Sequence, residues 1–267
     1  MKKRLLILLL LVPTLQNAPA AGASFAGASV SPGGTVTAQV PLSATEQSYV
    51  AEGGNAVPPY AVAVLAVPAG FDPAKTWPVL VSISTSDFKR QNSTDLVQFY
   101  RETALAQGWV VIAGDGPAPA RHDTSGWRAG TTLAALDALH RSFPGSKNWP
   151  VAVAGYSGGA KRAGTIAPLL AVAGLRVIGI YLTGINEERM VEAYRTFQPG
   201  AKFLQTPIFL STGSTDKVAP PASQRDVLLG MRRAGFARVR QEFFPNGHVV
   251  KRSHLRTALD WFRELQR

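Results

Sequence analysis

Short apolar runs alternate with longer amphipathic stretches along most of the chain from Tyr60 onward. The runs are rich in valine and isoleucine, as is typical of strands buried on both faces of a parallel sheet. Strands are predicted over 60–67, 78–84, 109–115, 150–156, 176–184, 207–213 and 237–244. Helices are predicted over 95–107, 129–142, 158–172, 187–197, 221–234 and 253–265, with Pro168 expected to kink or divide the third. This alternation predicts an α/β fold with a mostly parallel, doubly wound sheet.

The first residues follow a different pattern. A basic segment at 2–4 precedes an apolar run over 5–12, and small residues follow. The run is too short to span a bilayer, and the order of the three parts predicts a signal peptide over 1–23, cleaved after Ala20 or Ala23. We therefore expect a secreted or periplasmic bacterial protein, with no stable membrane insertion once the signal is removed.

The next segment, 24–56, has little periodicity. It is rich in glycine, alanine, serine, threonine and proline, a composition typical of linkers. We expect a flexible N-terminal arm over 24–56 and the folded domain over 57–267.

Composition and charge narrow the chemistry. The chain has no cysteine, which excludes disulfides and a thiolate nucleophile or metal ligand. The formal net charge is +11, of which the predicted signal peptide contributes three, so the rest carries +8. The basic residues are scattered and no nucleic-acid motif is present, so a solvated basic surface is expected and no nucleic-acid partner. Neither metal-ligand spacing nor a phosphate-binding loop occurs, so we expect no metal and no cofactor.

A serine stands where the fourth predicted strand meets the third predicted helix. The segment Gly155-Tyr156-Ser157-Gly158-Gly159 follows an apolar run and precedes a helical pattern. Glycines on both sides of a serine allow the sharp strand-to-helix turn that exposes a nucleophilic hydroxyl, the nucleophile elbow. The alternative is a glycine-rich turn whose serine has no chemical role.

A nucleophilic serine needs a histidine base and a carboxylate that orients it. Of the four histidines, His248 follows the last predicted strand in the loop "FFPNGHVV", whereas His254 begins the final helix and is the fallback. Asp216 lies in the loop "STGSTDKVAPP" after another strand. The chain order Ser157, Asp216, His248 is the order expected of an α/β-hydrolase, and each residue follows a strand at the same edge of the sheet. Asp115 and Asp123, also in loops, are interpreted as structural caps.

These motifs carry a family resemblance. From about Tyr60 to Arg267 the chain resembles the α/β-hydrolase superfamily through "VAVAGYSGGAKRAG", "STGSTDKVAPP" and "FPNGHVV". Within it, the chain is most similar to small exported esterases of the polyhydroxybutyrate-depolymerase and feruloyl-esterase type. The resemblance implies ester hydrolysis without a cofactor. No long insertion separates the later strands, so no large cap domain is expected.

One loop departs from the family pattern. Many relatives have His-Gly after the second core strand, whereas this chain has Ser84-Thr85 within "VSISTSDFKR". That loop normally supplies one backbone N–H of the oxyanion hole, and the residue after the nucleophile, here Gly158, supplies the other. We expect Ser86, or else Thr85, to supply the loop's N–H.

The sequence thus predicts an exported serine hydrolase acting on a small-molecule or polymer ester through an acyl-enzyme. A peptidase or amidase of the same fold is one alternative. A catalytically silent module that binds an envelope glycan or polymer is another, because the oxyanion loop is altered and the surface basic. The acyl and alcohol groups and the oligomeric state stay open.

Overall fold

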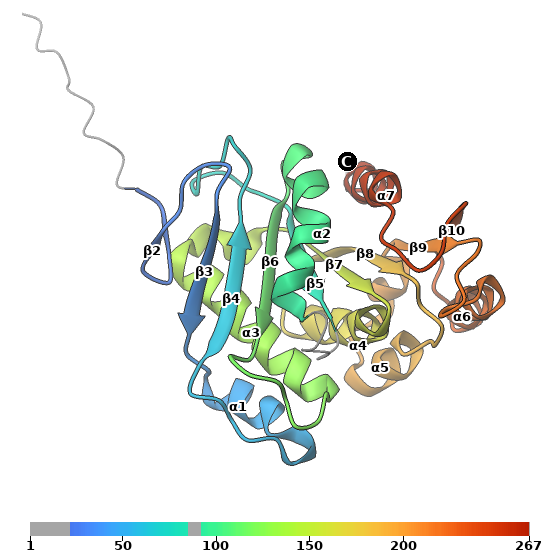
Figure 1. Ribbon diagram of the computed structural model, residues 1–267, viewed down its shortest axis with the longest axis horizontal. Helices are drawn as coiled ribbons and strands as arrows, with labels where there is room; N and C mark the ends of the chain where they lie inside the picture. Colours follow the sequence, from blue (N-terminus) through green and yellow to red (C-terminus); the bar gives the residue numbers. More distant parts are fainter. Residues whose placement is uncertain (1–21, 85–91, 267) are drawn as a thin grey trace, which may run out of the picture.

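A central eight-stranded sheet organises the part of the chain that the computed structural model describes, residues 22–84 and 92–266 (Figure 1). The strand order is β10-β9-β8-β7-β5-β6-β4-β3. The strands are β3 (Thr35–Val40), β4 (Ala61–Ala66), β5 (Val79–Ile83), β6 (Val110–Asp115), β7 (Val151–Tyr156), β8 (Val177–Thr183), β9 (Ile208–Gly213) and β10 (Val239–Phe244). Strands β5 to β10 pair in parallel, and β4 and β3 extend the sheet antiparallel at one edge. The predicted α/β class is confirmed.

Helices cover both faces of this sheet. They are α1 (Ala44–Val50), α2 (Ser93–Ala106), α3 (Ser125–Ser142), α4 (Gly158–Val172), α5 (Met190–Phe197), α6 (Pro221–Arg233) and α7 (Arg252–Glu264). One apolar core lies between the sheet and α2 with α7, and a larger one lies beneath α1, α3, α4, α5 and α6 (Figure 1). The described helices include none with the length and hydrophobicity to cross a bilayer.

The helix boundaries reflect local capping. Helix α3 begins at Ser125, earlier than expected, because the Thr124 hydroxyl accepts the N–H of Trp127 at 3.0 Å. Helix α4 continues through Pro168, so the expectation that this proline divides the helix is wrong. Proline removes a single hydrogen bond at that point, and apolar residues on both sides of it, Ile166 and Leu169, are buried.

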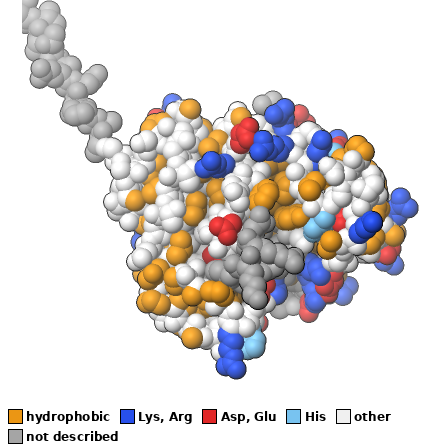
Figure 2. Space-filling view, viewed as in Figure 1, with side chains coloured by type: hydrophobic (Ala, Val, Ile, Leu, Met, Phe, Trp, Pro, Cys, Tyr) orange, Lys and Arg blue, Asp and Glu red, His pale blue; other side chains and the backbone are white. Residues whose placement is uncertain are grey.

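Basic side chains are dispersed over the face of the molecule seen in Figure 2, where they alternate with apolar and uncharged polar groups. This distribution resembles the scatter of lysine and arginine along the sequence.

The prediction of a flexible arm over 24–56 is wrong. These residues contain β1 (Ser24–Phe25), β2 (Ala28–Ser29), β3 and α1, and β3 pairs with β4 over its whole length. Residues 35–40 do alternate, with Val36, Ala38 and Val40 turned inward, but this alternation covers only six residues of a segment with linker-like composition. Helix α1 is equally short and is closed by a Ser43/Glu46 capping box. The folded unit therefore begins well before residue 57, whereas the expected signal peptide falls almost entirely on residues outside the described ones.

Helix α1 is fixed to the domain by close packing on α3. A Cβ on Gly130 of α3 would lie 2.5 Å from the carbonyl oxygen of Glu46 and 2.6 Å from Val50 Cγ2. No side chain fits there without separating the helices.

We predict that Gly130→Ala lowers the free energy of unfolding by about 1 to 3 kcal/mol, because the added methyl overpacks this contact. Gly145→Ala is the matched control, since a Cβ on Gly145 meets nothing within 4 Å. Urea unfolding of both variants measures the difference. Equal stability of the two variants would mean that α1 does not pack on α3 as described.

Candidate active site

A strained turn joins β7 to α4 at Ser157. Its backbone has φ 56° and ψ −126°, a conformation that costs a non-glycine residue about 1 to 3 kcal/mol. The N–H of Ser157 donates to the carbonyl of Thr183 at 2.9 Å, and the carbonyl of Ser157 accepts the N–H of Ala160 at 2.9 Å. Both bonds hold the turn, so the hydroxyl projects beyond the carboxyl end of the sheet.

The two glycines of the motif are required by close backbone packing. A Cβ on Gly155 would lie 2.6 Å from the Cα of Ala160, inside the first turn of α4. A Cβ on Gly159 would lie 2.7 Å from the Cα of Ser84, at the end of β5. Helix α4 can start above β7 and beside β5 only because these side chains are absent.

Three loops bring the sequence-predicted residues together at this edge. His248, after β10, places its Nε2 2.8 Å from Ser157 Oγ. Its Nδ1 lies 2.7 Å from Oδ2 of Asp216, which follows β9. The Asp216 side chain is 1% exposed and that of His248 is 17% exposed, so the imidazole lies between a buried carboxylate and a hydroxyl accessible from outside.

The Asp216 carboxylate is fixed by its own loop. Its Oδ1 accepts the backbone N–H groups of Val218 at 2.9 Å and Ala219 at 2.8 Å. These bonds leave Oδ2 for the imidazole. A carboxylate at Nδ1 sets the tautomer in which Nε2 can accept a proton from Ser157.

The seat of His248 is formed by residues that the sequence did not single out. Gly184, after β8, has φ +61°, and a Cβ there would lie 2.6 Å from Cε1 of His248. The hydroxyl of Tyr156 donates to the carbonyl of His248 at 2.8 Å, and the two rings lie 4.9 Å apart. Burial, and then the charge of Asp216, raise the pKa of Tyr156, so its hydroxyl stays a donor. Tyr156 stands inside the serine motif, which is the one signal that could have indicated it.

The expected oxyanion donors are only partly within the described residues. Gly158 is the first residue of α4, and N–H groups of a first helical turn have no partner within the helix. Ser86 and Thr85 lie outside the described residues. Ser84 is described, and its N–H donates to the Ser93 hydroxyl of α2 at 3.0 Å.

Asp115 and Asp123 serve the scaffold beside the site, in agreement with their interpretation as structural groups. The Asp115 carboxylate accepts the N–H of Ser93 at 2.9 Å, which caps α2, and forms a buried ion pair with Arg128. Asp123 accepts from Arg128 Nε at 2.9 Å. The pairing of Arg128, which is fully buried, is apparent only in the structure.

His254, the fallback base, belongs to a different environment. Its Nδ1 lies 3.0 Å from Ser211 Oγ, and its ring packs edge-on against Phe244. Burial lowers the pKa of His254, against the opposing charge of Glu242. Among the described residues, no group of three or more histidine and carboxylate side chains is placed to hold a metal ion.

The fold of this chain is that of the α/β-hydrolases, without a large cap domain in the described part. No protein-family model matches the chain, and no curated protein matches its sequence. Solved structures of esterases do match it. A bacterial heroin esterase is 18% identical with a TM-score of 0.60, and the match covers 88% of this chain and 84% of the heroin esterase. An esterase from Pyrobaculum calidifontis is 14% identical with a TM-score of 0.59, covering 88% and 86%.

Two further structures widen the comparison. A ferulic acid esterase is 15% identical with a TM-score of 0.53, covering 87% of this chain and 98% of its own. A protein assigned as a dipeptidyl aminopeptidase IV from Bacteroides ovatus is 12% identical with a TM-score of 0.54 over 87% of this chain. This chain spans only 35% of that protein's length. At such identities the likeness establishes the fold.

We predict that His254 makes the protein less stable as the pH falls below about 6.5, the ordinary pKa of histidine. Because burial lowers its pKa in the folded state, the unfolded chain binds the proton more readily in acid, and protonation favours unfolding. His254→Asn, which retains a polar atom near Ser211, should show a smaller loss of unfolding free energy between about pH 7.5 and about pH 5. Urea titrations at both pH values measure it, and an unchanged loss in the variant would contradict the prediction.

Proposed function

We propose that this protein is a serine hydrolase that cleaves carboxylic esters through an acyl-enzyme. The observation that carries the proposal is the hydrogen-bonded chain from Ser157 Oγ through His248 to the buried Asp216, placed on a strained elbow. A serine hydroxyl is a weak nucleophile alone, and this arrangement is the one that activates it. The esterases among the similar structures support ester cleavage.

The geometry supports a two-stage reaction. Ser157 Oγ attacks the ester carbonyl carbon while His248 Nε2 takes the hydroxyl proton, and Asp216 stabilises the resulting imidazolium. The C–O bond to the alcohol then breaks, and His248 returns the proton to the departing oxygen. In the second stage His248 deprotonates a water molecule that attacks the acyl carbon, and the acid leaves as Ser157 regains its proton. These steps use no cofactor.

The negative charge on the carbonyl oxygen needs hydrogen-bond donors. The N–H of Gly158 is the first, because it directly follows the nucleophile at the positive end of α4. The second is expected from the backbone N–H of Ser86. We also propose export through the signal peptide expected over 1–23.

Esters are favoured over peptides for this chain. The peptidase-like neighbour is a much longer protein, of which this chain spans about a third. A silent binding module has no need for the strained serine or for the positive φ at Gly184 that makes room for His248, whereas a nucleophile and its base need both.

We predict that Ser157→Ala abolishes labelling by a fluorophosphonate and lowers turnover of p-nitrophenyl esters by about a million-fold, because the attacking oxygen is gone. Intact mass and initial rates measure the two effects. Ser253→Ala, at an exposed serine of α7, is the control and should keep both. Labelling that persists in Ser157→Ala would identify another nucleophile, and an unmutated protein that is neither labelled nor active would favour the silent module.

We predict that His248→Ala lowers kcat by a similar factor, whereas His254→Ala keeps most of the activity of the folded protein. His248 contacts Ser157 Oγ, while His254 contacts Ser211. Steady-state kinetics on both variants, with circular dichroism as a check of folding, decide between them. Loss of activity in folded His254→Ala with normal activity in His248→Ala would reverse the assignment of the base.

A further inference from the structure

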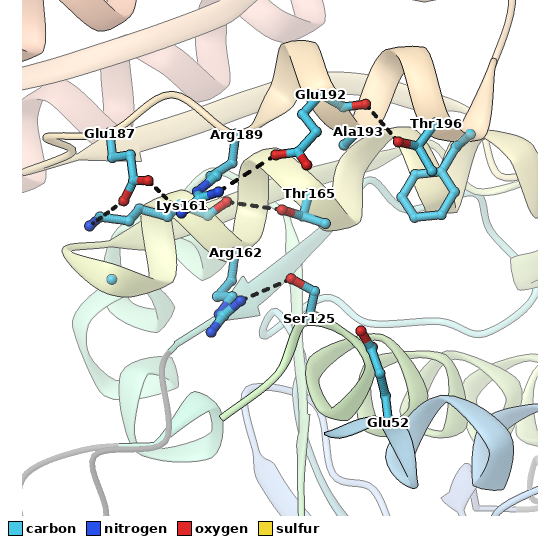
Figure 3. A pocket seen from close by; sticks show the side chains of 12 residues that line it. Glu52, Ser125, Lys161, Arg162, Thr165, Glu187, Arg189, Glu192, Ala193 and Thr196 are labelled. Carbon is cyan, nitrogen blue, oxygen red and sulfur yellow. Dashed lines mark hydrogen bonds and ion pairs between the residues drawn. The ribbon is translucent and has the colours of Figure 1, made fainter. Parts of the chain in front are cut away.

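A hollow of about 570 Å³ opens beside the nucleophile and follows α4 away from it. It begins at Gly158, and Lys161, Arg162 and Thr165 line it from successive turns of the helix (Figure 3). Residues of α5 and the loop before it form another wall, and Ser125 of α3 lies opposite Arg162.

A second hollow of about 360 Å³ continues the first. The two share five lining residues, among them Thr165 of α4 and Thr196 of α5. Beyond these threonines the lining becomes largely apolar, with Tyr49, Ile166 and Leu169 among the side chains. We refer to the two hollows together as the α4 trench.

The trench is long enough for an extended chain. Thr165 lies eight residues beyond Ser157, which places it about 12 Å along the helix at a rise of about 1.5 Å per residue. Leu169 lies about 18 Å along by the same measure. Because C–C bonds of about 1.5 Å zigzag, an extended hydrocarbon advances about 1.25 Å per bond, so it needs about ten bonds to reach Thr165 and about fourteen to reach Leu169.

The charges at the near end compensate one another. Lys161 Nζ lies 2.9 Å from Glu187 Oε2, and Arg189 pairs with Glu187 and with Glu192. Arg162 donates to the Ser125 hydroxyl at 2.9 Å. The cations of this wall already have carboxylate partners, so they offer no unpaired positive charge to an anionic ligand. Glu52, an exposed carboxylate that lines both hollows, repels an anion as well, so an uncharged group suits the trench.

The position of His248 decides which arm of an ester enters the trench. The departing alcohol oxygen must come within hydrogen-bond distance of His248 Nε2, which returns its proton. His248 lines neither hollow, whereas Gly158, the expected oxyanion donor, lines the first. The alcohol therefore lies on the His248 side, and the acyl arm has the side of Gly158 and α4.

We propose that the α4 trench binds the acyl arm of the substrate, and that the substrate is an ester of a long, uncharged acid with an apolar end. Thr165 and Thr196 are the specificity-determining residues, since they flank the passage from the polar to the apolar section. The inference rests on the proposed ester hydrolysis and adds the class of acyl group.

The test compares kcat/KM for p-nitrophenyl hexadecanoate, whose acyl chain is about 19 Å long when extended, and p-nitrophenyl acetate in two blocked variants, Thr165→Trp and Thr196→Trp. Thr257→Trp is the matched control. Each of the three is a helical threonine whose hydroxyl donates to the carbonyl four residues before it, but Thr257 lies on α7, outside the trench. The hexadecanoate-to-acetate ratio should fall by about ten- to a hundred-fold in both blocked variants, because the methylene groups beyond Thr165 lose their burial. It should stay within about two-fold of the unmutated value in the control.

The ratio cancels effects on the chemical step, which both substrates share. An unchanged ratio in the folded blocked variants overturns the proposal, as does an unmutated protein that cleaves the acetate ester but not the hexadecanoate ester. If Thr165→Trp does not fold, Thr196→Trp decides alone, because Thr196 is exposed. An unmutated protein that cleaves neither ester contradicts the proposed function itself, which separates the two failures.

Discussion

The close approach of α4 to the ends of β7 and β5 is the constraint on which the site depends. The chain must leave β7 and begin a helix within one residue, and the helix backbone passes within contact of Ser84 and of its own strand. Only glycine at 155 and 159 permits this, and Ser157 must take a positive φ to complete the turn. The strain, about 1 to 3 kcal/mol, is offset by the apolar face that α4 buries against the sheet.

The role proposed for Ser157 requires that the histidine beside it be held as firmly as the serine itself. The loop that carries His248 meets three separate restraints: the Tyr156 hydroxyl on its carbonyl, the bare backbone of Gly184 against its ring, and the Asp216 carboxylate on Nδ1. Tyr156 immediately precedes Ser157, the proposed nucleophile, so the same turn positions Ser157 and the residue that holds His248. The distance between Ser157 and His248 therefore depends on few flexible torsions, which is what a preorganised proton transfer requires.

Features that depend on neighbouring residues in the sequence could be predicted, whereas features that depend on distant residues could not. Continuous apolar strands and a serine between glycines are local patterns, and parallel strands place their following loops at one edge, so Ser157, Asp216 and His248 could be grouped in advance. The seat at Gly184 depends on the register of β8 beside β7, which no local pattern shows. Strand β3 was missed because its alternation of inward Val36, Ala38 and Val40 covers only six residues of a segment with linker-like composition, and its stability comes from pairing with β4. The burial of Arg128 could not be predicted, because nothing in its segment distinguishes a buried arginine from an exposed one, and only the structure shows its ion pair with Asp115.

Two faces of α4 have different surroundings, because its residues repeat about every 3.6 positions. Ala160, Ala163 and Ala167, three and four residues apart, are fully buried, and their small size allows the approach that forces the elbow. Gly158, Lys161 and Thr165, on the neighbouring face, line the trench. Because these two sets share no residue, Lys161 and Thr165 can change without altering the packing that exposes Ser157, whereas Ile166 and Leu169 at the apolar end belong both to the trench and to the buried core. The proposed chemistry and the proposed preference for an acyl group therefore both depend on α4, but on different contacts of this helix. For that reason, blocking the trench should change the preference between esters and leave Ser157 in place.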